Sequence, residues 1–272
     1  MDWLSEPFSH AFMQRAAVAG ILAAVTTSLV GTWVVLRGLT FMGDALAHGV
    51  LPGIALAVLW GFDPTVGAAA SAILMVLGIN VVHRYSRLNE DAGIGLLFVG
   101  MLALGVVIIS RTPSYTGSLT GILFGDALAV TTGDIALLAA TLVAVVVATA
   151  VFYRSFLVLS FNADKAEMLG LYPRVAHVVM LGLVTLAVVA SFRTVGSLLV
   201  FGLLVAPPAT ASLLVRRVPA MMAVGACLGI ASVAVGLLVS WDADTAASAT
   251  VAAVAVAVFF VVLAFQPQSK RG

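Results

Sequence analysis

The sequence predicts an all-α integral membrane protein that crosses the bilayer about eight or nine times. Of its 272 residues, 62% are apolar and only 9% are charged, and the apolar residues form long continuous runs. A soluble domain carries roughly a quarter charged residues, so the surface of this chain must face lipid. In lipid only helices and closed barrels satisfy the backbone. Barrel strands alternate polar and apolar residues, and a run such as "LLAATLVAVVVATAVF" does not.

The apolar runs set the expected spans, because a helix needs roughly 20 apolar residues to cross the hydrocarbon layer. By that measure the spans cover residues 12–36, 41–60, 64–82, 92–110, 132–152, 174–191, 194–215, 219–240 and 245–265. The second is the least regular, because Gly43, Gly49, Pro52 and Gly53 interrupt it. We find no repeat, linker or low-complexity tract, so residues 1–272 are expected to form one transmembrane domain.

The Lys and Arg residues indicate the orientation, because cytoplasmic loops are enriched in positive charge. If the amino terminus lies outside, ten of them fall on the cytoplasmic side: Arg37, Arg84, Arg87, Arg154, Lys165, Arg174, Arg216, Arg217, Lys270 and Arg271. Three fall outside: Arg15, Arg111 and Arg193. The carboxyl terminus is therefore expected inside. An eight-span count would move only the amino terminus inward.

Asp44 and His48 are the strongest candidates for chemistry, because ionisable residues inside spans are costly and mark functional sites. They lie four residues apart in "GLTFMGDALAHGVLPG", so a helix places both on one face. Counting about 1.5 Å per residue from Arg37 places His48 roughly 16 Å deep, near the midplane. A carboxylate and an imidazole can hold a divalent transition metal. Two ligands bind weakly, as a transport site requires, and a symmetric dimer could supply two more.

A structural interpretation of this pair stays open. Asp44 can cap a helix that starts after Gly43, and His48 can bind a neighbouring carbonyl. The glycines and Pro52 favour the functional interpretation, because broken helices at mid-depth typically line a site or a cavity. Three other acidic residues are expected to cap helices or face water: Asp126, Asp242 and Asp244.

Two further segments have predicted roles. Pro207 and Pro208 fall inside the seventh expected span and predict a bend there. Between the fifth and sixth spans, Asn162 can cap a short cytoplasmic helix that ends near Gly170 and Pro173. The chain contains no G-x-x-x-x-G-K-[ST], so it cannot hold ATP phosphates through that motif. An active transporter built from this chain would take its energy from another subunit.

Five segments resemble the permease subunits of bacterial ABC importers for zinc, manganese and iron. They are "VVLRGLTFMGDALAHGVLPGIAL", "EDAGIGLLF", "LFGDALAV", "FNADKAEMLGL" and "VGSLLVFGLLVAPPATASLL", in the family's order over nearly the whole chain. The resemblance implies the fold of metal-type importer permeases, with an ion path at Asp44 and His48. It also implies a homodimer of permeases, two cytoplasmic ATP-binding subunits and an extracytoplasmic metal-binding protein.

The resemblance also assigns the short cytoplasmic helix to ATPase coupling. This coupling helix comprises Ala163, Asp164, Lys165, Ala166, Glu167, Gly170 and Leu171. The implied protein is a multi-pass subunit of the bacterial plasma membrane, embedded in lipid, with no nucleic-acid partner. It has no catalytic residue and no cofactor of its own, since it carries zinc, manganese or iron and ATP binds to the partner. The stretch "DADTAASAT" lacks the Pro and Gly that family members often carry there, so no ligand role is expected for Asp242 or Asp244.

Other functions stay open. A permease for larger metal chelates, such as a corrinoid or a siderophore, would not require Asp44 or His48. It would need room and stacking groups, and only 8% of the residues are aromatic. An intramembrane aspartyl protease would pair Asp44 with Asp126 at one depth, and Asp126 is predicted in a loop. The long cytoplasmic loop at residues 154–173 argues against a pump or channel that works without ATP.

Overall fold

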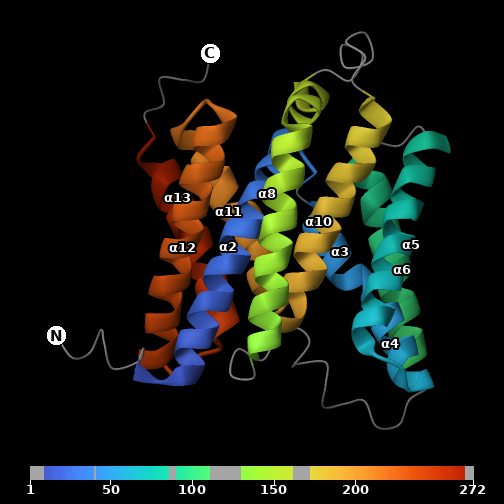
Figure 1. The fold of residues 1–272 in the computed structure, drawn as a ribbon, viewed down its shortest axis with the longest axis horizontal. Helices are drawn as coiled ribbons and strands as arrows, with labels where there is room; N and C mark the ends of the chain where they lie inside the picture. The colour runs from blue at the N-terminus through green and yellow to red at the C-terminus, as the bar shows by residue number, and fades with distance from the viewer. Residues whose placement is uncertain (1–8, 40, 86–89, 111–129, 162–171, 267–272) are drawn as a thin grey trace.

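The computed structural model is a bundle of α-helices (Figure 1). It describes residues 9–39, 41–85, 90–110, 130–161 and 172–266. Over these ranges it contains no strand and ten helices: α2 (Ala11–Arg37), α3 (Phe41–Gly49), α4 (Leu51–Trp60), α5 (Pro64–Tyr85), α6 (Glu90–Ser110), α8 (Thr132–Phe161), α10 (Pro173–Val195), α11 (Ser197–Leu214), α12 (Val218–Asp242) and α13 (Ala247–Ala264). The predicted all-α class is confirmed.

Each expected span coincides with a helix, or in one case with the pair α3 and α4. The largest difference is at α8, which continues to Phe161, beyond the expected end at residue 152. Within the described ranges, eight helical stretches are long and apolar enough to cross a membrane, with α3 and α4 counted together. The ninth, α11, has a slightly shorter apolar stretch, Leu198–Leu214. Helix α2 begins at one end of the bundle and α13 ends at the other (Figure 1), as an odd number of crossings requires.

Helix α2 lies at the centre of one group of helices and packs against α8, α10, α11 and α12. A second group, α3 to α6, packs together and contacts the first group through α10 and α11 (Figure 1). The most apolar stretches of α2, α3–α4 and α10 are 61–71% buried, whereas those of α6, α8 and α13 are only 17–22% buried. The first three are therefore interior elements, and the others present apolar faces to their surroundings.

The second span is interrupted between Gly49 and Leu51, as its glycines and Pro52 predict. Pro52 lies in the first turn of α4, where a missing N–H is tolerated. Because Pro52 has no N–H, it cannot donate to the carbonyl of His48, four residues earlier. Helix α4 begins anew with a bond from the Ile54 N–H to the Val50 carbonyl, at 3.1 Å. The carbonyl of His48 therefore lacks the donor that a continuous helix would supply.

Helices α4 and α5 pack backbone to backbone beside this interruption. A Cβ on Gly53 would overlap the carbonyl oxygen of Gly67, and a Cβ on Gly67 would overlap the carbonyl oxygen of Gly53. On the other side, a Cβ on Gly105 of α6 would lie 3.2–3.4 Å from Leu51 and Pro52. Small residues therefore let two neighbouring helices close around the broken span.

Helix α11 continues through Pro207 and Pro208. Pro208 cannot donate to the carbonyl of Leu204, and that oxygen lies against Gly31 of α2, where a Cβ would overlap it. Glycine at position 31 therefore allows α2 and α11 to approach closely. The bend predicted at the two prolines stays a prediction.

A single residue, Gly196, joins α10 to α11 with φ 80° and ψ 161°. This backbone region is essentially restricted to glycine, so Gly196→Ala is expected to cost about 1–3 kcal/mol. The matched control is Gly182→Ala within α10, where a Cβ would meet nothing within 4 Å. Thermal unfolding of the purified protein in detergent should show a Tm lowered by roughly 2–10 °C for the first variant only. Equal Tm values for the two variants would contradict this account of the junction.

Candidate metal site

Asp44 and His48 lie side by side on α3. The Nε2 atom of His48 is 3.4 Å from Oδ1 of Asp44, and their side chains are 22% and 30% exposed. Hydrogen bonds between nitrogen and oxygen are usually 2.7–3.2 Å long, so the two side chains are close but do not form a hydrogen bond of the usual length. The two side chains are thus partly accessible and lie beside each other.

Helices α11 and α5 contact α3 just before Asp44 and just after His48. Gly43 lies against α11, where a Cβ would be 3.4 Å from the ring of Phe201. On the far side of His48, the buried hydroxyl of Ser71 in α5 donates to the carbonyl of Gly49 at 2.9 Å. A Cβ on Gly49 would also be 3.4 Å from Met75. The carbonyl that follows His48 is therefore satisfied by a neighbouring helix.

Aromatic side chains from α3 and α6 lie next to the pair. The ring of Phe98 meets the imidazole of His48 with centroids 5.8 Å apart and planes at 61°. The ring of Phe41 meets Phe98 with centroids 5.4 Å apart and planes at 88°. Sequence reasoning missed Phe98 and Ser71. Ser71 could have been identified from its sequence context, because Gly67 and Ser71 are small residues four apart on one helix, a spacing typical of close helix packing.

Arg37 and His177 connect the carboxyl-terminal end of α2 to α10. Nη1 of Arg37 lies 2.7 Å from Nδ1 of His177. A guanidinium group can only donate, so Nδ1 accepts and the imidazole carries its proton on Nε2. His177 is 7% exposed. These contacts give His177 a structural role between two interior helices.

The other sequence-predicted residues do not join Asp44 and His48 in the described part of the chain. Asp242 is the last residue of α12 and Asp244 lies in the turn that follows it. Both residues are exposed, and Asp244 has a φ of 49°. Asp126 and the coupling helix at residues 163–171 lie outside the described residues. Within the described ranges, no group of three or more His, Cys, Asp or Glu side chains is placed to hold a metal.

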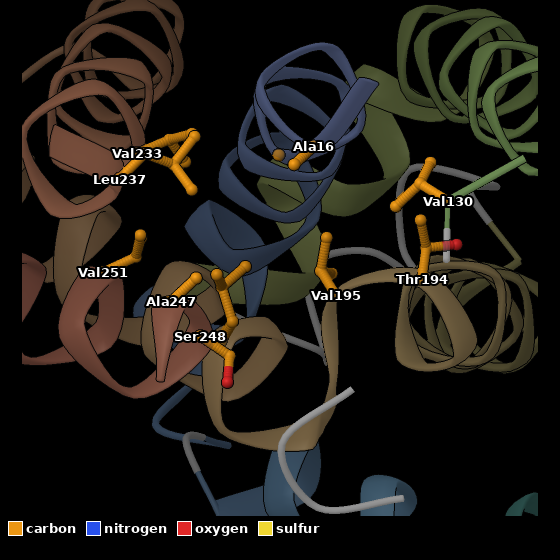
Figure 2. Close-up of a pocket in the computed structure, with 11 residues that line it drawn as sticks. Ala16, Val130, Thr194, Val195, Val233, Leu237, Ala247, Ser248 and Val251 are labelled. Carbon is orange, nitrogen blue, oxygen red and sulfur yellow. The ribbon is translucent and has the colours of Figure 1, made fainter. Parts of the chain in front are cut away.

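A small cavity lies between α2, α12, α13 and the junction of α10 with α11 (Figure 2). Its lining is mostly aliphatic, including Val195, Val233 and Val251, with hydroxyl groups from Thr194 and Ser248. Its volume is about 20 Å³. One water molecule needs about 10–15 Å³, so this cavity cannot hold a metal chelate.

A bundle of membrane-length helices with a carboxylate and an imidazole on an interrupted interior helix is typical of membrane transport subunits. The model of the ABC 3 transport family matches residues 9–266, and the chain belongs to this family. The resemblance to permease subunits of bacterial metal importers is thereby confirmed. The chain is a multi-pass protein of the bacterial plasma membrane.

Relatives of known name match over nearly their whole length. The manganese transport system membrane protein MntC of Listeria innocua is 35% identical over 98% of this chain and 95% of its own. A probable iron transport system membrane protein of Haemophilus influenzae is 35% identical over 97% of each chain. The solved structure of PsaBC from Streptococcus pneumoniae in complex with Fab matches with a TM-score of 0.85 and 28% identity, over 99% of this chain and 97% of that chain.

The hydrogen bond from Ser71 to Gly49 predicts a measurable cost when it is removed. Ser71→Ala leaves the buried Gly49 carbonyl without this donor and is expected to destabilise the protein by about 1–3 kcal/mol. The matched control is Ser110→Ala, because the Ser110 hydroxyl is exposed and donates within its own helix. Thermal unfolding in detergent compares the two. A Ser71→Ala variant as stable as the control would show that the interruption does not depend on this bond.

Proposed function

We propose that this chain is the permease of an ATP-driven importer of divalent transition-metal ions, with Asp44 and His48 as ligands of the ion in transit. The observation that carries the proposal is the 3.4 Å separation of Nε2 and Oδ1 on a partly exposed face of an interrupted helix. The relatives named as manganese and iron transport proteins favour manganese or iron as the ion. Zinc, which the sequence also suggests, enters as a competing outcome of the test.

The separation suits one ion bound by both side chains. Imidazole nitrogen and carboxylate oxygen bind zinc at about 2.0–2.2 Å, and two ligands at a tetrahedral angle are then about 3.3 Å apart. A carboxylate also offsets cation charge in the low dielectric of the membrane. The pair can therefore accept an ion with little movement of either side chain.

Two ligands leave most of the coordination sphere to other groups. A homodimer of permeases would bring a second Asp44 and His48 to a central path and double the number of ligands. An ion held this way would be bound weakly in one copy and more tightly between two. Transport needs such a change in affinity, because an ion that never leaves cannot be delivered.

The energy would come from two cytoplasmic ATP-binding subunits, and an extracytoplasmic metal-binding protein would deliver the ion. Residues 163–171, where the coupling helix is predicted, come directly before α10 in the sequence, and α10 begins at Pro173. Helix α10 is joined to α2 by the bond between Arg37 and His177, and α2 leads within a few residues into α3. This chain of contacts supports a route from the ATPase to the helix that carries the ligands.

Substitution of either ligand is expected to lower ATP-dependent metal uptake by at least about tenfold, since loss of even a supporting group around a metal costs 10–100-fold. The variants are Asp44→Asn and His48→Gln, in proteoliposomes that contain the permease with its ATPase and metal-binding partners. Matched controls are Asp244→Asn and His10→Gln, because both residues are exposed at the outer end of the bundle. Uptake of manganese, iron and zinc is measured in parallel, which names the ion. Wild-type uptake of all three by both ligand variants would overturn the proposal.

A further inference from the structure

We infer that Phe98 is a positioning residue of the ion path, which orients the imidazole of His48 and forms an apolar wall beside the ligands. The inference rests on the proposed function of Asp44 and His48. It concerns a residue of α6, outside the helix that carries both ligands.

Neither the backbone of α3 nor the contact with Asp44 fixes the orientation of the His48 ring. The last torsion of a histidine side chain is broad, so the backbone and the helix do not fix which way the ring faces. The contact with Asp44 is 3.4 Å long, which is beyond the usual length of a hydrogen bond. An edge-to-face contact with Phe98, at 5.8 Å and 61°, restricts rotation of the imidazole.

Phe98 lies across the face of α3 that carries the ligands. Phe41, Asp44 and His48 follow one another at spacings of three and four residues, which places them on one face of a helix. Phe98 contacts the rings of Phe41 and His48, the first and last of the three. One ring from α6 therefore spans the segment that contains both ligands.

The packing of α6 leaves Phe98 available for this role. Its neighbour Leu97 packs on α5, where a Cβ on Gly78 would lie 3.2 Å from Leu97. Ile94 is fully buried in the core. Phe98 is only half-buried. Since a phenyl ring offers no ligand atom and excludes water, it confines the ion to the other side of the pair.

Loss of the ring is expected to weaken ion binding rather than slow transport of bound ions. Phe98→Ala and Phe98→Leu should raise the KM for Mn²⁺ about fivefold to tenfold, the factor that corresponds to one aromatic contact. The maximal rate per folded transporter should change less than about twofold. Phe98→Tyr retains the ring and should behave as wild type.

The control is Phe41→Leu, which removes a ring that contacts Phe98 and leaves the contact between Phe98 and His48 in place. ATP-dependent Mn²⁺ uptake is measured over a range of concentrations in proteoliposomes with the complete transporter, normalised to monodisperse protein. If Phe98→Ala does not fold, the measurement on Phe98→Leu decides the outcome. An unchanged KM in Phe98→Leu, or an equal rise in Phe41→Leu, overturns the inference. If Asp44→Asn and His48→Gln abolish uptake while Phe98→Leu keeps the wild-type KM, only the inference about Phe98 is wrong. If Asp44→Asn and His48→Gln transport normally, the proposed function itself is wrong.

Discussion

A helix that breaks inside a membrane exposes backbone groups that lipid cannot satisfy, so the break must be enclosed by protein. The interruption between α3 and α4 imposes this constraint on its neighbours. Ser71 of α5 donates to the Gly49 carbonyl, Gly53 and Gly67 allow α4 and α5 to touch, and α11 lies against Gly43. The interior position of α3 and α4, with 71% of their most apolar stretch buried, follows from the same requirement. The arrangement of half of the bundle thus depends on one broken span.

The break also makes the site possible. Because α3 ends one residue after His48, its orientation is set by contacts with α5, α6, α10 and α11 and not by a continuous helix. Asp44 and His48 then lie on a short, enclosed element that is surrounded by these four helices. A small movement of any of these helices would change the 3.4 Å distance between Nε2 of His48 and Oδ1 of Asp44, the two atoms proposed to bind the ion. A weak and adjustable pair is what a carrier needs, whereas a structural metal site would have four fixed ligands.

Much of this could be predicted from the sequence. Long apolar runs fix the helices, and the four-residue spacing of Asp44 and His48 places both on one face, because both patterns are local. The interruption of the second span is also a local property of Gly49, Pro52 and Gly53. The contacts of Ser71 and Phe98 could not be predicted this way, since they depend on which helices become neighbours. The close approach of Leu204 to Gly31 could not be predicted for the same reason. The sequence shows that Pro208 leaves the Leu204 carbonyl without its helical donor, but it does not show which helix packs against that carbonyl.

The central claim is that the transported ion is bound by the imidazole of His48. Pulsed electron paramagnetic resonance of the complete transporter loaded with Mn²⁺ tests it directly, because a coordinated imidazole nitrogen modulates the electron-spin echo. The account predicts a nitrogen modulation in the wild type that disappears in His48→Gln and persists in His177→Gln. A modulation that survives in His48→Gln, or a wild-type ion with oxygen ligands alone, would contradict it.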